Sequence, residues 1–146
     1  MTEQLRTLIS RLEQYIEKAC ERNDQYDFAT SMTEISDALE QAENNFEAIG
    51  PILELIERNP DLNYGAPGPL AHFMEAYYKK GYEELLVNSI KRKPTEYTLF
   101  LLHRVMNDTH NPNHLAFLDL MKKVSLNKEY PENIIDQARD SLTYFQ

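Results

Sequence analysis

The chain contains few of the residues that disulfide-bonded, metal-binding or membrane proteins need. Among its 146 residues there are one cysteine, no tryptophan and only four glycines. A single thiol forms no internal disulfide and cannot by itself build a cysteine zinc site. No run of about 18 apolar residues occurs, so the sequence predicts no membrane-spanning helix. The start, Met1 to Arg6, lacks the features of a secretory signal. We therefore expect a cytoplasmic protein, with Cys20 buried as a small apolar residue on a helix.

Positive charge is also scarce. The chain has 15 Lys/Arg against 24 Asp/Glu and a net charge of −9. This balance excludes nucleic acid as the expected partner, because phosphate binding needs a basic surface. The imbalance is local: residues 1–76 hold 15 Asp/Glu and 5 Lys/Arg, whereas residues 77–146 hold 9 and 10. Two explanations stay open, namely a solvated surface that maintains solubility and an acidic face that meets a basic partner.

Apolar residues recur at spacings of three and four almost throughout the chain, which is the period of an amphipathic helix. No segment alternates strictly enough to predict a strand. The pattern therefore predicts eight helices. Their apolar stripes run, in chain order, over residues 5–19, 28–42, 46–56, 70–77, 82–90, 98–106, 115–124 and 134–142.

Several residues mark where these helices begin, bend or end. Asn44 or Asn45 is suited to cap the third helix, and Thr95 is suited to cap the sixth. Pro51 lies inside the third helix, where it removes a backbone donor, so we expect a kink or a restart there. Gly81 is placed to end the fourth helix.

Helices of this length with short connections predict an all-α protein built of consecutive antiparallel hairpins. We expect residues 1–146 to form a single all-helical domain. Stacked hairpins of this kind resemble HEAT-type solenoids with right-handed stacking. A closed helical bundle is the alternative, and the oligomeric state is left open.

A search for catalytic motifs finds none: there is no GxSxG, HExxH, GxGxxG or phosphate-binding loop. His110 and His114 have the spacing of a helical metal pair, but Pro112 between them prevents a continuous helix. The carboxylates lie on polar helix faces, where a solvated surface explains them. We therefore predict no catalytic, cofactor-binding or metal-binding residues, and no cofactor. An enzyme that uses His72, His103 or the His110/His114 pair is the least favoured alternative.

The segment from Asp61 to Phe73 contains the most irregular stretch of the chain, Leu62 to Pro69. It holds two of the four glycines and two of the seven prolines. A stiff loop orders its backbone for recognition at little entropic cost, but a structural corner between hairpins is the slightly favoured explanation. Nearby tyrosines suit an interface because they combine a large area with few rotamers. For Tyr77 and Tyr82, packing between helices is the favoured explanation.

Four short segments in the middle of the chain resemble small helical immunity proteins found beside bacterial polymorphic toxins, including those of contact-dependent growth inhibition systems. These segments are Tyr64–Glu75, Gly81–Leu86, Ser89–Thr95 and Leu102–Asn107. They cover about a third of the chain. The resemblance implies a protein that neutralises one cognate toxin by tight binding and has no activity of its own. Many such toxins are cationic nucleases, which an acidic partner would attract.

The acidic helices and the loop beside them are accordingly predicted to contact the toxin. The predicted contact residues are Asp37, Glu40, Glu43, Glu47, Asp61, Tyr64, His72 and Tyr78. A helical-repeat scaffold or adaptor that binds another protein is the main alternative, and it predicts no toxin gene nearby.

Overall fold

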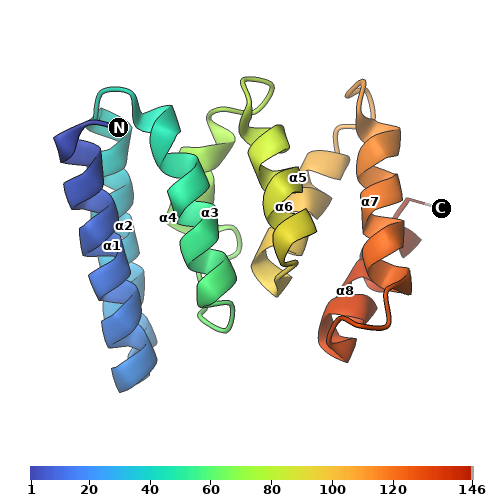
Figure 1. Ribbon diagram of the computed structural model, residues 1–146, viewed down its shortest axis with the longest axis horizontal. Coiled ribbons are helices and arrows are strands. Elements are labelled where there is room, and N and C mark those ends of the chain that lie inside the picture. The colour runs from blue at the N-terminus through green and yellow to red at the C-terminus, as the bar shows by residue number, and fades with distance from the viewer. Residues whose placement is uncertain (146) are drawn as a thin grey trace. The chain divides into compact units, whose positions relative to one another are not determined.

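The computed structural model describes residues 1–145 and contains only helices and turns over that range (Figure 1). The expected all-α class is therefore confirmed. Residues 1–145 form eight α-helices and one 3-10 helix, η1. Their bounds are α1 Glu3–Arg22, α2 Gln25–Gln41, η1 Asn45–Ala48, α3 Ile49–Arg58, α4 Gly68–Glu75, α5 Tyr82–Arg92, α6 Glu96–Met106, α7 His114–Leu126 and α8 Glu132–Thr143.

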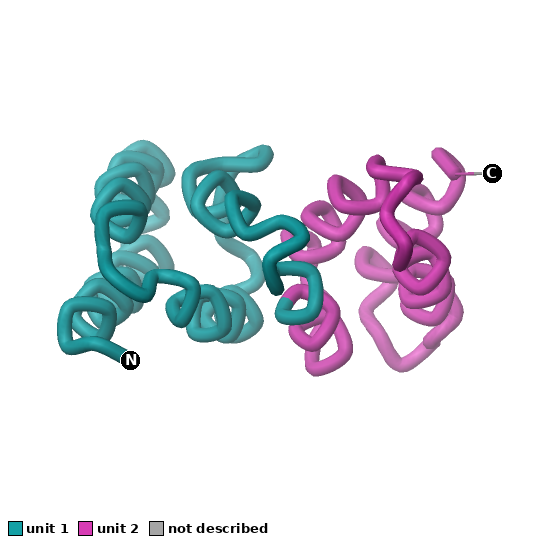
Figure 2. The backbone as a smooth tube through the Cα atoms, turned by 90° about the horizontal axis from the view of Figure 1, so that it is seen from above, with its two compact units in different colours: residues 1–85 teal, residues 86–146 magenta. Residues whose placement is uncertain are grey.

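The chain divides into two compact units, unit 1 with residues 1–85 and unit 2 with residues 86–146 (Figure 2). In unit 1, α1 packs against α2 and α3, and α2 packs against α4. In unit 2, α6, α7 and α8 pack against one another. The single domain over 1–146 and the HEAT-like stacking stay predictions.

The first helix shows how the local sequence sets an element. The hydroxyl of Thr2 accepts a hydrogen bond from the backbone N–H of Leu5 at 3.1 Å, which caps the helix start. Asn23 ends α1 in the left-handed conformation, and its N–H donates to the carbonyl of Ala19. Between these ends, the buried residues follow the predicted stripe: Leu5, Leu8, Leu12, Ile16 and Ala19.

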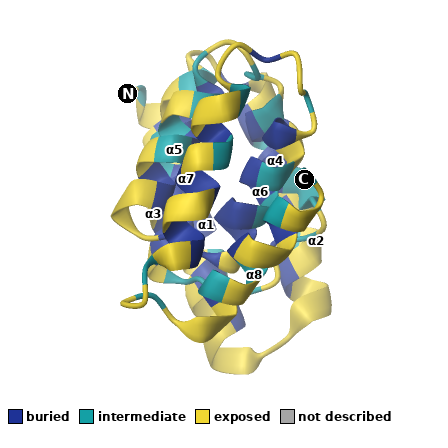
Figure 3. Cartoon of the chain, turned by 90° about the vertical axis from the view of Figure 1, so that its right-hand side faces the viewer, coloured by how far each residue is buried: buried dark blue, intermediate teal, exposed yellow. Residues whose placement is uncertain are grey.

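Burial follows the amphipathic pattern in the other helices as well. Buried and exposed residues lie on opposite sides of the helices (Figure 3). The largest fully buried side chains include Phe73 and Tyr82, so the explanation of Tyr82 as a packing residue is confirmed. No helix among residues 1–145 combines the length and the apolar character needed to cross a bilayer.

The expected break at Pro51 lies instead between η1 and α3, at Ala48 and Ile49. Pro51 is the third residue of α3, where the backbone N–H has no partner within the helix, so the proline removes no hydrogen bond. Asn44 precedes η1 in the left-handed conformation (φ 55°) and its side chain makes no cap, while the Asn45 amide donates to the carbonyl of Leu39 at 3.0 Å. Neither asparagine caps the helix as predicted.

Gly81 does not end the fourth helix, which stops six residues earlier, at Glu75. A turn then leads to Gly81, whose φ of +109° lies in the region that favours glycine. A Cβ atom at Gly81 would lie 2.8 Å from the Phe46 ring. Gly81 therefore permits a close approach of the chain to η1, a tertiary role that helical periodicity cannot predict.

The start of α6 is capped in both directions. Thr95 accepts a hydrogen bond from the N–H of Thr98, and the Thr98 hydroxyl accepts one from the N–H of Thr95, both at 3.1 Å. This reciprocal arrangement is a capping box, here made by two threonines that are both buried. The predicted cap at Thr95 is confirmed.

Cys20 is exposed, so the prediction that it is buried is wrong. It belongs to a continuous exposed stretch, residues 20–27, where α1 ends and α2 begins. The apolar stripe of α1 ends at Ala19, one residue earlier. The Sγ atom lies 3.9 Å from Oδ1 of Asn59, yet the residue stays exposed, so position on a helix alone does not bury the thiol.

Candidate functional site

The exposed face of α2 carries three carboxylates in a defined order. At 3.6 residues per turn, Glu34, Asp37 and Glu40 are spaced by about 60° around the helix axis. Glu34 lies toward α1, where its Oε1 is 2.5 Å from Nη2 of Arg11. Glu40 lies toward α4, where its Oε1 is 3.6 Å from Nε2 of His72. Asp37 lies between them and is exposed.

The acidic surface continues past the end of α2. Glu43 is exposed in the turn, and Glu47 is exposed in the first turn of η1. The carboxylate of Glu47 lies 3.7 Å from the amino group of Met1. We call Asp37, Glu40, Glu43 and Glu47 the α2 acidic face, although Glu47 already has a cationic neighbour.

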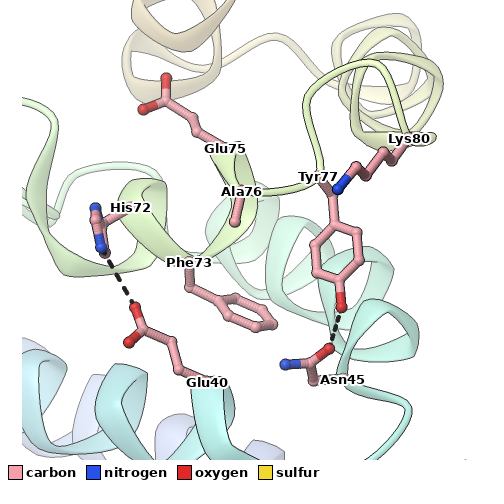
Figure 4. A pocket seen from close by; sticks show the side chains of 8 residues that line it. All are labelled: Glu40, Asn45, His72, Phe73, Glu75, Ala76, Tyr77 and Lys80. Atoms are coloured by element: carbon pink, nitrogen blue, oxygen red, sulfur yellow. Dashed lines mark hydrogen bonds and ion pairs between the residues drawn. The ribbon is translucent and has the colours of Figure 1, made fainter.

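An open hollow of about 600 Å³ adjoins this face in unit 1. In Figure 4, the Glu40 and His72 side chains lie on one side of the Phe73 ring, and the hydrogen-bonded Tyr77 and Asn45 side chains lie on the other. The complete lining is Glu40, Asn45, His72, Phe73, Glu75, Ala76, Tyr77 and Lys80. The hollow is open to solvent and its charges are mixed, so it is suited to contact with a side chain and not to shielding a reaction from water.

Aromatic packing fixes the floor of the hollow. The Tyr77 ring lies 5.1 Å from the Phe46 ring and 6.4 Å from the Phe73 ring, measured between centroids. The Tyr77 hydroxyl donates to Oδ1 of Asn45. Tyr77 therefore joins η1 to the turn after α4, in agreement with its interpretation as a packing residue, and its polar end still lines the hollow.

The irregular loop between α3 and α4 is held by its own side chains. The Tyr64 hydroxyl donates to the carbonyl of Asn59 at 2.6 Å, and the ring lies edge-on to Phe28. The Gln25 amide donates to the carbonyl of Asn63 at 2.9 Å. These contacts order the loop without a partner, so both the corner and the recognition explanations remain compatible with it.

The structure brings some predicted contact residues together and separates others. Glu40 and His72 touch, and Asp37 shares the exposed face of α2 with Glu40. Tyr64 is only 2% exposed, so its role is to hold the loop and it offers no contact area. Tyr78 is half-buried, with the Lys79 ammonium 5.7 Å from its ring centroid.

Asp61 is exposed on the loop after α3. Sequence reasoning missed Asn45 and Lys80 as lining residues, and it missed Glu34 as the third carboxylate on the exposed face of α2. Glu34 was detectable, since it precedes Asp37 by three residues, the same spacing that separates Asp37 from Glu40. Lys80 lines the hollow because of the path of the turn after α4, which the sequence pattern does not define.

The histidines do not assemble into a site. His110 lies in a turn and His114 is the first residue of α7, so the two share no helix. Among residues 1–145, no three His, Cys, Asp or Glu side chains converge in a way that could hold a metal ion. His103 packs in unit 2, with Nδ1 2.6 Å from Oγ of Ser141 and with the Tyr144 ring edge-on to it. Burial lowers the pKa of His103.

Several residues of the segments that resemble immunity proteins have structural roles. Tyr64 orders the loop before α4, Tyr82 is fully buried at the start of α5, and Thr95 caps α6. A comparison of the chain with models of known families, with curated proteins and with solved structures finds no match. The resemblance therefore stays a prediction, and function has to be argued from the surface of the molecule.

Proposed function

We propose that the chain is a cytoplasmic immunity protein, which binds one cognate bacterial toxin and blocks it by occupying its working surface. The observation that carries this proposal is the distribution of charge between the units. Unit 1 holds 17 Asp/Glu and 7 Lys/Arg, a balance of −10, while unit 2 holds 7 and 8, a balance of +1. All the excess negative charge thus belongs to the unit that contains the α2 acidic face.

A concentrated acidic surface favours a basic partner in two ways. It raises the encounter rate through long-range attraction, and it opposes binding to acidic proteins through repulsion. A toxin that acts on nucleic acid carries a basic groove, and an acidic protein can cover that groove. Inhibition by coverage requires no bond to be made or broken by this chain.

The rigidity of the surface supports the same proposal. The loop before α4 is ordered by Tyr64 and Gln25, and the carboxylates of Glu34 and Glu40 lie beside Arg11 and His72. The Tyr15 hydroxyl, and after it Glu34, raise the pKa of Arg11, whose guanidinium is charged at neutral pH in any case. A preformed surface loses little conformational entropy when it binds, so more of the contact energy contributes to affinity.

Co-expression with the product of the adjacent upstream gene tests the function. If that product is a toxin, this chain should restore growth of the host cell and should co-purify with it. A scaffold or adaptor would show neither effect, although it would bind some other protein. A toxic neighbour whose effect persists despite folded, abundant chain would contradict the proposal.

Charge reversal tests the surface. The variant Asp37→Lys/Glu40→Lys/Glu43→Lys should associate with the toxin about 10- to 100-fold more slowly at low salt, and the difference should shrink as salt is added. The matched control, Glu129→Lys/Glu132→Lys/Asp140→Lys, makes the same charge change in unit 2 and should alter the rate by less than about threefold. Equal effects from both triple variants would show that net charge matters and that this surface does not.

A further inference from the structure

Two leucines on α7 are exposed to an extent unlike the other leucines of the helices. Leu115 is 77% exposed and Leu126 is 78% exposed. They are 11 residues apart, which is about three helical turns, so both lie on one face. Single exposed apolar residues are common on protein surfaces, so what matters here is the order of the residues along this face.

Two charged residues lie between the leucines on the same face. At 100° per residue, Leu115, Asp119, Lys122 and Leu126 lie within an arc of about 60°. The side that packs against the rest of unit 2 is opposite, with Phe117, Leu120, Met121 and Val124 buried there. We call the four exposed residues the α7 face.

The order of residues on the α7 face is self-complementary. When a second α7 is laid antiparallel against the first, Leu115 faces Leu126 and Asp119 faces Lys122, because both pairs are symmetric about the same point in the helix. Each contact occurs twice, as it does in a twofold interface. We propose that the α7 face is a dimerisation surface, and that its partner is the α7 face of a second copy of this chain, packed antiparallel.

Charge selects this orientation over the parallel one. A parallel pair would place Asp119 against Asp119 and Lys122 against Lys122, and like charges that face each other disfavour association. In the single chain, Asp119 contacts Lys123 at 3.0 Å along the helix. Both side chains are more than 60% exposed, so this exposed pair contributes little and Asp119 can turn to Lys122 of the second copy.

The size of the surface sets the expected strength. The α7 face spans about 16 Å of one helix. A typical stable interface buries roughly 800 Å² on each partner, which is more than four side chains over this length can supply. We therefore expect a dimer that forms reversibly as concentration rises. The α2 acidic face belongs to unit 1, so dimerisation through α7 does not depend on the proposed toxin or on its binding.

Sedimentation over a range of protein concentrations tests the dimer. The average mass should rise from 17.1 kDa toward twice that value. Asp119→Lys and Lys122→Asp should each weaken the dimer at least about tenfold, because each places like charges together twice. The double variant Asp119→Lys/Lys122→Asp should restore it. Asp140→Lys, an exposed charge reversal on α8, is the control and should leave the mass unchanged.

Cross-linking tests the antiparallel register. In a Cys20→Ser background, one chain carries Leu115→Cys and the other, with a larger tag, carries Leu126→Cys. A short bismaleimide should link the mixture into a mixed dimer and should link neither variant to itself, because identical positions are about 16 Å apart in the antiparallel pair. Self-linking of either variant, or a mass of 17.1 kDa at every concentration, would overturn the proposal. Circular dichroism checks that each variant keeps its helix content.

Discussion

Unit 1 and unit 2 are built from the same kind of element but present different surfaces. Unit 1 carries a balance of −10 and exposes carboxylates along α2, while unit 2 is nearly neutral and exposes leucines along α7. The two units also differ in how their chains turn. Unit 1 uses a 3-10 helix and glycine-dependent turns, whereas α6 of unit 2 begins at a full capping box.

This difference suggests that the chain separates two kinds of contact. Charge acts over about a Debye length and suits recognition of a basic partner, whereas apolar area acts only on contact and suits a weak self-association. The two surfaces belong to different helices, so each can be changed by substitution while the other remains intact. The following predictions test how far the contrast between the units extends.

The largest loss of stability should come from truncating a core residue in either unit. Phe73 in unit 1 is 1% exposed and Leu102 in unit 2 is fully buried. Phe73→Ala should lower the free energy of unfolding by about 3–5 kcal/mol, and Leu102→Ala by about 2–5 kcal/mol, through lost burial and a cavity. Urea denaturation measures both losses.

Hydrogen exchange then locates each loss. Contacts are concentrated within the units, so Phe73→Ala should reduce amide protection mainly in residues 1–85, and Leu102→Ala mainly in residues 86–146. The boundary falls inside α5, between Leu85 and Leu86. Equal loss of protection in both units from either variant would show that they unfold as one.

Substitutions in a turn of unit 1 and in a helix cap of unit 2 should lower the free energy of unfolding by intermediate amounts. Gly81→Ala combines an unfavourable φ with a Cβ atom 2.8 Å from Phe46, and should cost about 2–4 kcal/mol. Thr95→Ala removes one half of the capping box and should cost about 1–2 kcal/mol. Thermal and urea unfolding compare the two. Gly50→Ala, where nothing lies within 4 Å of the added Cβ atom, is the control and should not destabilise the protein.

The smallest effect should be a pH dependence that arises in unit 2. Burial lowers the pKa of His103 below its ordinary value of 6.5. The unfolded chain therefore binds the proton more readily than the folded chain. The stability that the neutral, buried imidazole allows is fully present above about pH 6.5, and it is lost as the pH falls below that value. The free energy of unfolding should fall more between pH 7.5 and 5.5 in the wild type than in His103→Gln. His110→Gln controls for the loss of one imidazole, and an identical pH dependence in His103→Gln and wild type would contradict the assignment.

The fold was largely predictable because its signals are local. The apolar stripe of α1 and the Thr95 cap each depend on residues within a few positions of one another, and both are confirmed. The errors at Pro51 and Gly81 have a different origin. Their roles depend on where η1 lies and on the approach of Phe46, which are tertiary facts.

The candidate site was predictable only in part. Charge counts directed attention to residues 1–76, and two of the predicted contact residues there, Glu40 and His72, do lie together. Exposure, however, depends on neighbouring helices, which is why Tyr64 is buried and Cys20 is not. The self-complementary order on α7 was present in the sequence, but it acquires meaning only once Leu115 and Leu126 are known to be exposed.

Asn59, at the end of α3, has a chemical consequence for the lifetime of the protein. Its amide donates to the carbonyl of Leu55 at 3.0 Å, and its own carbonyl accepts the Tyr64 hydroxyl, so it joins the helix to the loop. Asparagines age by deamidation, in which the backbone nitrogen of the next residue attacks the side-chain amide. The next residue here is Pro60, whose nitrogen carries no hydrogen. This junction is therefore protected from slow conversion to aspartate, which would replace its donor with a charge.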